Sequence, residues 1–300
     1  MSCGPGPSPP ADRPAGRSSP AAVQVGAVTA VAWPEQLQLA TDLARRANQP
    51  AAWPGIGIYD PGPLRIIVVP DARRLDSLTQ GRAPAWGAAV ALPGSRVILL
   101  RADAGDLYIT LRHELAHLAL HRAVPGRVPL WFDEGYASWA AGEWDRLGTL
   151  DLNLAVVRGA VPDLRELDGA LRGSASTADA AYALAASAVA ELARRNPTGS
   201  LTPLMTRLQR GQDFELSVRE TTGLTLAQFD GEWRRAVRQR YSFATWLLAG
   251  GGWGLFALTL WGLVRLRRRA DRERRAALDI GWDVPPETPA LAELDRTPQP

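Results

Sequence analysis

The sequence has a single cysteine and no lysine. Because Cys3 has no partner in the chain, no internal disulfide can form, and zinc sites built from several cysteines are excluded. All 34 basic residues are arginine, and the net charge is only +3. Much of the arginine gathers beside one apolar segment rather than on a basic face with interleaved aromatic residues. The composition therefore gives no indication of nucleic-acid binding.

The first residues lack the apolar run of a secretory signal, which is about 7–15 residues long. Six prolines stand among the first twenty positions, with Ser, Gly and Arg between them. Such a composition buries too little apolar surface to offset the entropy of folding. We therefore expect residues 1–22 to be disordered and residues 23–240 to form the folded domain.

Within residues 23–240, strand patterns come before most of the helix patterns. An amphipathic helix is predicted from Pro34 to Asn48, after which apolar runs bounded by turn residues predict strands at 64–69, 85–92 and 96–100. The last two strands flank Pro93-Gly94 and are expected to form a hairpin. Further helices are predicted at 107–123, 130–141, 178–195, 201–210 and 225–240. This order favours an α+β fold.

Residues 241–264 are a run of 24 residues without a charge. About 20 apolar residues cross a bilayer, so the run predicts a single transmembrane helix with the lipid bilayer as its partner. Trp246 and Trp261 lie near its ends, where membrane interfaces favour indoles. Gly250 and Gly254 have the G-x-x-x-G spacing that can support a homodimer.

The arginines that flank the apolar run predict its orientation. Residues 265–275 contain seven arginines, whereas the ten residues before Tyr241 contain four. Because the more basic flank tends to stay inside, we expect residues 265–300, basic and then proline-rich, to be a cytoplasmic tail of a cell-membrane protein. The folded domain would then be extracytoplasmic. Export would require a start upstream of Met1 that carries a signal; otherwise the run would act as a C-terminal anchor for a cytoplasmic domain.

All three histidines lie within nine residues, in the sequence LRHELAHLALH. On a helix, positions four apart differ by about 40° around the axis and about 6 Å along it, so His113 and His117 can converge on one cation. Glu114 follows the first histidine and is directed so that its carboxylate can reach a water on the metal. This H-E-x-x-H arrangement indicates a zinc hydrolase.

A catalytic zinc ion needs a third protein ligand. His121 is eight positions from His113, about 12 Å along a straight helix, which is too far to share a metal with it. We expect His121 to lie in solvent or to contact a metal ligand without binding the metal itself. The remaining candidates lie downstream in VPLWFDEGYASWAAG, where a second helix could present a carboxylate. Chemistry alone leaves both Asp133 and Glu134 open.

The segments RHELAHLAL and PLWFDEGYAS together resemble the gluzincin peptidases, especially the peptidase MA-like families. Their pattern is H-E-x-x-H followed by a helix with W-[LF]-x-E-G-x-A, and the likeness extends over roughly residues 60–240. The resemblance implies a zincin-like fold, in which a small mixed β-sheet and the active-site helix extend to about residue 125. A helical part would then occupy residues 126–240.

The resemblance also implies roles for individual residues. His113, His117 and Glu134 would hold one Zn²⁺ per chain, because only Glu134 occupies the E of E-G-x-A. Glu114 would be the catalytic base. Tyr182 is a candidate donor of a hydrogen bond to the oxyanion, as a Tyr or His is in related enzymes.

These expectations describe a membrane-anchored zinc metallopeptidase that hydrolyses peptide bonds of a peptide or protein substrate. An extended substrate could add to the sheet edge offered by residues 85–92. The alternative is a non-catalytic, membrane-bound protein of zincin fold that serves in binding or scaffolding. The presence of Glu114 favours the enzyme over that alternative, because a purely structural zinc site needs no general base.

Overall fold

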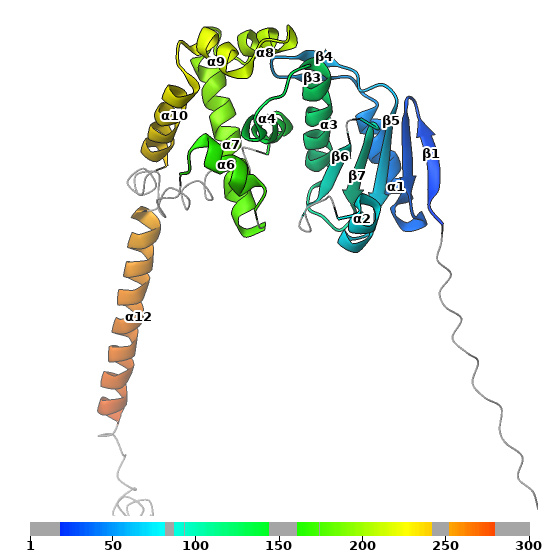
Figure 1. Cartoon of the computed structure of the whole chain (residues 1–300). Helices are drawn as coiled ribbons and strands as arrows, with labels where there is room; N and C mark the ends of the chain where they lie inside the picture. Colours follow the sequence, from blue (N-terminus) through cyan, green and yellow to red (C-terminus); the bar gives the residue numbers. More distant parts are fainter. Residues whose placement is uncertain are drawn as a thin grey trace, which may run out of the picture. The chain divides into compact units, whose positions relative to one another are not determined.

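The computed structural model describes residues 19–81, 87–92, 94–143, 161–173, 175–241 and 252–279. The chain divides into two compact units, Met1–Ser242 and Phe243–Pro300, and each is described by itself. The first unit contains a β-sheet with its covering helices and a second, wholly helical group (Figure 1). The predicted α+β class is confirmed.

A five-stranded mixed sheet forms one part of the first unit. Its strands, in spatial order, are β1 (Ala21–Val25), β2 (Val28–Ala32), β5 (Leu64–Val69), β7 (Val97–Arg101) and β6 (Ala89–Leu92). The three inner strands are parallel, whereas β1 is antiparallel to β2 and β6 is antiparallel to β7. The strand at 64–69 and the β6–β7 hairpin confirm the sequence prediction, although β6 begins at Ala89 and residues 85 and 86 of the predicted strand lie outside the described residues. Strand β6 lies at the edge of the sheet.

The hairpin β1–β2 was not predicted, and β1 begins at Ala21, inside the range 1–22 that composition marks as disordered. Residues 1–18 of that range lie outside the described residues. The last proline of the N-terminal run is Pro20, and β1 begins directly after it, so the predicted boundary at residue 22 was slightly too late. Gly26 makes the hairpin turn with φ of 58°, and a Cβ there would lie 2.4 Å from the Asn48 side chain. Glycine therefore provides both the backbone conformation and the space that the turn requires.

Helices cover both faces of this sheet. Helices α1 (Leu37–Ala47) and α3 (Leu107–Ala123) pack on one face, and α2 (Ala72–Thr79) packs on the other. The core under α1 and α3 is built from small and branched side chains that alternate along the strands, among them Val28, Ala30, Ile66, Val68, Ile98 and Leu100. This alternation is the period of two that places every second residue on the covered face.

The helical group follows α3 in the sequence. It contains α4 (Leu130–Ala141), α6 (Leu164–Leu171), α7 (Ala175–Arg195), α8 (Thr202–Gln209), α9 (Phe214–Thr222) and α10 (Leu226–Arg240). A two-stranded hairpin of β3 (Ala51–Trp53) and β4 (Gly57–Tyr59) packs against it through Trp53. The predicted bounds of α3 and α4 are confirmed, whereas α2, α6 and α9 were not predicted.

Helix α3 lies between the sheet and the helical group and belongs to both hydrophobic cores (Figure 1). Leu107 and Leu111 pack toward the sheet, whereas Ala119 and Leu120 pack toward α4 and its neighbours. A helix that is apolar on most of its circumference is stable only when it is buried on several sides. The position of α3 therefore explains why its sequence shows no clean polar face.

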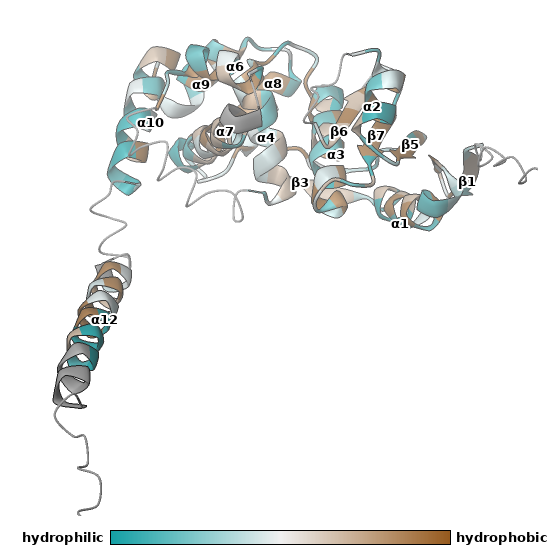
Figure 2. Ribbon diagram, turned by 90° about the horizontal axis from the view of Figure 1, so that it is seen from below, coloured by the Kyte–Doolittle hydropathy of each residue, from teal (hydrophilic) through white to brown (hydrophobic). Residues whose placement is uncertain are grey.

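The second unit contains α12 (Gly252–Asp279). Its first half is apolar and the turns directly after it are hydrophilic, as the change from brown to teal along the helix in Figure 2 shows. Large apolar side chains of the first half are exposed, with Trp253 at 76% and Leu258 at 64%. The helix continues past Val264 into the arginine-rich sequence, so the predicted limit at residue 264 is not a helix end.

The transmembrane helix predicted at 241–264 falls partly on residues 242–251, which lie outside the described residues. Among the helices of the described ranges, none is long and apolar enough to cross a membrane.

Candidate metal centre

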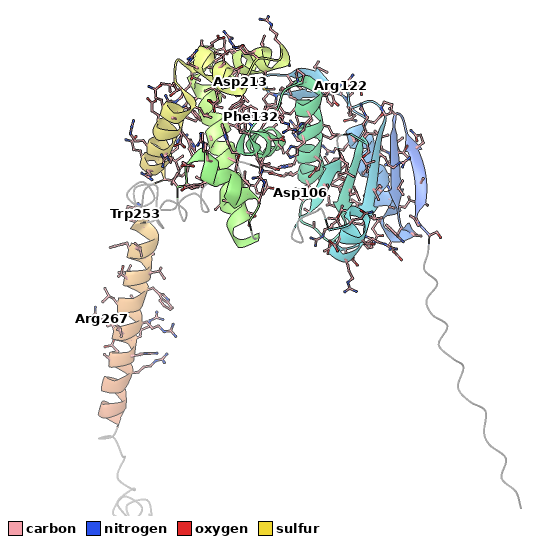
Figure 3. All side chains as sticks on the ribbon, viewed as in Figure 1. Asp106, Arg122, Phe132, Asp213, Trp253 and Arg267 are labelled. Atoms are coloured by element: carbon pink, nitrogen blue, oxygen red, sulfur yellow. The ribbon has the colours of Figure 1, made fainter. Side chains whose placement is uncertain are left out.

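Helix α3 presents the histidines along the side that faces α4. Its first turn is capped by Asp106, whose carboxylate accepts hydrogen bonds from the backbone N–H groups of Tyr108 at 3.1 Å and Ile109 at 3.3 Å. Figure 3 labels Asp106 and Arg122 near the two ends of this helix. The cap fixes where α3 begins, and the 3.6-residue repeat then sets the direction of each histidine.

Helix α4 is held close to both α3 and α7. Pro129 precedes its first turn. The backbone N–H of Trp131 has no acceptor within the helix and donates instead to the Asp168 carboxylate at 2.7 Å. At Gly135 a Cβ would lie 2.4 Å from the backbone oxygen of Ala185 in α7. Only glycine permits this approach. The glycine that follows Glu134 is thus required by packing, and the packing fixes the depth at which Glu134 meets α3.

Three donor atoms converge between α3 and α4. His113 Nε2 and His117 Nε2 lie 3.1 Å apart, and Glu134 Oε2 lies 3.5 Å from each of them. In a tetrahedral zinc site with bonds of about 2.0–2.1 Å, two ligand atoms lie about 3.3–3.4 Å apart. The observed distances lie close to this spacing, so His113, His117 and Glu134 form a group that could hold a metal ion.

Each histidine of this triangle is held from its other ring nitrogen by a carboxylate. His117 Nδ1 donates to Asp133 Oδ1 at 2.7 Å, and His113 Nδ1 donates to Glu143 Oε2 at 3.1 Å. A carboxylate on Nδ1 favours the tautomer in which Nε2 carries a free lone pair, and it also fixes the ring plane. Both Nε2 atoms are therefore prepared to act as ligands.

The structure separates the two acids that the sequence left open. Glu134 faces the two Nε2 atoms, whereas Asp133 bonds to His117 Nδ1 and to His121 Nε2, the latter at 2.8 Å. Of the three histidines, His121 is the most exposed, with 43% of its side chain accessible. It supports Asp133 and does not join the triangle of donors.

Glu143 was missed by the sequence reasoning. Helix α4 ends at Ala141. The next residue, Gly142, has φ of 81°, and the backbone N–H of Glu143 donates to the Ser138 carbonyl at 3.1 Å. This left-handed turn brings Glu143 back beside His113. A glycine after the last helical residue signals the turn, but nothing in the sequence shows which histidine an acid placed there will meet.

The surrounding carboxylates make the centre favourable for positive charge. Burial by itself would lower the pKa of His113, but the contacts with Glu134 and Glu143 outweigh burial and raise this pKa to about 9. The pKa of His117 is raised for the same reason, against burial, by Asp133 and Glu134. The pKa of Glu134 is correspondingly lowered by its two histidine partners, although burial opposes this shift. A metal cation can take the place of these protons.

Glu114 lies beside the triangle on the side of the sheet. It is 8% exposed, and its carboxylate accepts a hydrogen bond from the backbone N–H of Ala91 in the edge strand β6. Burial raises the pKa of Glu114, whereas the nearby His113 and His117 lower it, and burial dominates. Glu114 is therefore a stronger base than a carboxylate in water.

Tyr182 reaches the same place from α7. Its ring lies 6.1 Å from the His113 ring, centroid to centroid, in an edge-to-face arrangement. Burial raises the pKa of Tyr182, and so do the carboxylates of Glu134 and Glu114. The hydroxyl therefore keeps its proton and remains a hydrogen-bond donor. The structure thus brings together all five residues singled out from the sequence, from α3, α4 and α7.

Comparison with known proteins agrees with this arrangement. No curated protein matches the sequence. A family model described as the peptidase MA superfamily matches residues 56–239, more than half of the chain, and the matched range includes α3, α4 and α7. The chain therefore belongs to the peptidase MA superfamily.

Proposed function

We propose that the protein is a gluzincin-type peptidase with a zincin-like fold that hydrolyses peptide bonds with one zinc ion per chain. One observation carries this proposal: His113, His117 and Glu134 place three donor atoms 3.1–3.5 Å apart, with the buried Glu114 next to them. Three protein ligands leave a fourth tetrahedral position open, which is the arrangement of catalytic rather than structural zinc.

In this proposal, each side chain at the centre has one task. Zinc would supply Lewis acidity, both to polarise the scissile carbonyl and to make water lose a proton near neutral pH. Glu114 takes the proton from the attacking water on a carboxylate oxygen and later delivers it to the departing amine nitrogen. The backbone N–H of Ala91 interacts with the Glu114 carboxylate and favours its charged form.

Tyr182 is proposed to stabilise the negative oxygen of the tetrahedral intermediate. Its position beside His113 and Glu134, together with its raised pKa, makes it a protonated donor at the edge of the centre. A donor that is already held in place near the developing charge needs little reorganisation during the reaction.

The substrate is proposed to be an extended peptide that lies along β6. This strand is at the edge of the sheet, pairs only with β7 among the described strands, and provides the N–H that holds Glu114. A peptide added to such an edge is bound mainly through backbone hydrogen bonds, with less dependence on its side chains.

Glu114→Gln tests the proposed reaction directly. The amide keeps the size of the side chain but cannot accept the proton, so we expect hydrolysis of a peptide library to fall by about 10²–10⁴-fold while zinc stays bound at one ion per chain. Glu215→Gln, an exposed acid on α9, is the matched control and should keep full activity. Undiminished, chelator-sensitive hydrolysis by Glu114→Gln would contradict the proposal.

We also propose that residues 241–264 attach the peptidase to the cell membrane, with the residues from Arg265 onward in the cytoplasm and the catalytic domain outside. The exposed apolar side chains in the first half of α12 and the arginines that follow them support this proposal.

Spheroplasts test the orientation. Added protease should digest the catalytic domain and spare an epitope placed at the C-terminus, because the membrane would shield only the tail. A catalytic domain that is protected until the membrane is lysed would reverse the proposed orientation. Recovery of the uncleaved protein in the fraction that alkali extracts from membranes would argue against anchoring.

A further inference from the structure

We propose that His121 is a positioning residue of the metal centre, which acts through Asp133 to hold His117 in its ligand orientation. The inference rests on the proposed zinc centre and extends it to a histidine that the peptidase mechanism does not use. Its basis is a hydrogen-bonded chain that starts at an exposed side chain and ends at a donor atom of the triangle.

Asp133 stands in the middle of this chain. Its Oδ1 accepts from His117 Nδ1 at 2.7 Å, and its Oδ2 accepts from His121 Nε2 at 2.8 Å. The two imidazoles stack at a centroid distance of 6.3 Å with an interplanar angle of 29°. Because His117 and His121 are four residues apart on α3, one carboxylate from α4 can reach both rings at once.

Both oxygens of Asp133 are thereby occupied, and this limits its freedom. A carboxylate held at only one oxygen can rotate about its last torsion or exchange its partner for water. With His121 bound to Oδ2, rotation would break two hydrogen bonds instead of one. Asp133 therefore remains aligned with His117 Nδ1, and His117 Nε2 remains directed at His113 and Glu134.

The same three residues could in principle hold a second cation, since their donor atoms lie close together. Two observations favour hydrogen bonds instead. The contacts of 2.7 Å and 2.8 Å are hydrogen-bond lengths and are shorter than the spacing of about 3.3–3.4 Å between ligands of a tetrahedral zinc ion. In addition, His117 Nδ1 needs its proton if Nε2 is to coordinate the first ion.

The inference predicts a loss of metal affinity without a loss of metal stoichiometry. We expect His121→Ala to bind zinc about tenfold more weakly in competition with a chromogenic chelator, at the low end of the effect of removing a residue that supports a ligand. At saturating zinc it should still hold one ion per chain. His121→Gln offers an amide N–H near the place of Nε2 and should recover part of the affinity.

Arg122→Ala is the matched control, because Arg122 is the exposed neighbour of His121 on α3 and should leave zinc affinity unchanged. Thermal unfolding of the metal-free proteins separates positioning from packing. A positioning role predicts that His121→Ala unfolds at the same temperature as the parent when metal is absent, and at a lower temperature when zinc is limiting.

Three outcomes would overturn the inference: equal zinc affinity in His121→Ala and the parent, an equal loss of stability with and without metal, or two zinc ions per chain of which one disappears in His121→Ala. None of these depends on peptidase activity. If the parent and His113→Ala bind zinc equally poorly, the proposed zinc centre itself fails, and that result is distinguishable from a failure confined to His121.

Discussion

The metal centre and a second charged cluster in the same unit use partly buried acids in different ways. In the second cluster, which we call the arginine cluster, Glu191 of α7 pairs with Arg194 and Arg195, and Arg195 also pairs with Glu232 of α10. Its acids are neutralised by permanent cations of the chain. At the metal centre the carboxylates of Glu134, Asp133 and Glu143 are instead paired with histidines.

The two clusters differ in the cation that neutralises their acids. Arginine keeps its charge at every physiological pH, so the arginine cluster is complete when the protein has folded. Histidine gains its charge only by binding a proton, and the same lone pair can bind a metal instead. The raised pKa values of His113 and His117 show that the acids around them favour a cation at that point. One cluster stabilises the fold, and the other retains a place for an added charge.

Removal of Glu134 should distinguish the two clusters most strongly. We expect Glu134→Ala to lose more than about 100-fold in zinc affinity, because loss of a ligand should exceed the roughly 10–100-fold cost of losing a residue that only supports one. Equilibrium competition with a chelator measures this loss. Glu232→Ala removes an acid of the arginine cluster and should bind zinc as the parent does. Full zinc occupancy in Glu134→Ala would exclude Glu134 as a ligand.

Gly135→Ala should damage the metal centre through packing alone. The added methyl group meets the Ala185 carbonyl, so α4 must move away from α7 and carry Glu134 with it. We expect a loss of about 1–3 kcal/mol in the free energy of unfolding and a weaker affinity for zinc, measured by urea titration and chelator competition.

Gly231→Ala on α10 is the control for that change, because a Cβ there meets nothing within 4 Å. Alanine stabilises an open helical position by up to about 1 kcal/mol relative to glycine. If both substitutions had the same effect, the close approach of α4 to α7 would not be what positions Glu134.

The smallest effect is expected in the arginine cluster. Glu191→Gln should lower the free energy of unfolding by about 1 kcal/mol near neutral pH and leave zinc affinity unchanged. Burial raises the pKa of Glu191, but Arg194 and Arg195 outweigh burial and lower it below the ordinary value of 4.5. The stabilisation is therefore present above that ordinary value and is lost as pH falls through the lower folded-state pKa.

As the pH falls, the free energies of unfolding of Glu191→Gln and the parent should therefore become equal. Urea unfolding at several pH values measures both. A difference that persists unchanged after acidification would mean that Glu191 acts by shape rather than by charge.

The sequence predicted the two helices that carry the metal centre better than it predicted the residues that hold the ligands in place. The H-E-x-x-H spacing and the apolar residues around it predicted α3 with the bounds that the structure has, and the same holds for α4. Both helices have strong local signals: a run of buried residues and turn residues at the ends. Asp133 and Glu134 are neighbours with the same chemistry, so only the direction of α4 relative to α3 could separate them on physical grounds.

The residues that hold His113 and Glu114 in place could not be predicted, because their contacts depend on how distant segments of the chain pack. Glu143 reaches His113 only after the left-handed turn at Gly142, and Ala91 reaches Glu114 only because β6 lies at the edge of the sheet next to α3. The hairpin β1–β2 was not predicted because its strands, AAVQV and VTAVA, each contain two alanines, and alanine is depleted in strands.

The shared burial of α3 has a consequence for how the protein unfolds. A helix that contributes side chains to two cores cannot leave one of them without exposing apolar surface in the other. The sheet and the helical group should therefore melt as one cooperative unit rather than as separate folding units. Because the histidines lie on that helix, the ability to retain metal should vanish in the same transition, and bound metal would report on the integrity of both halves at once.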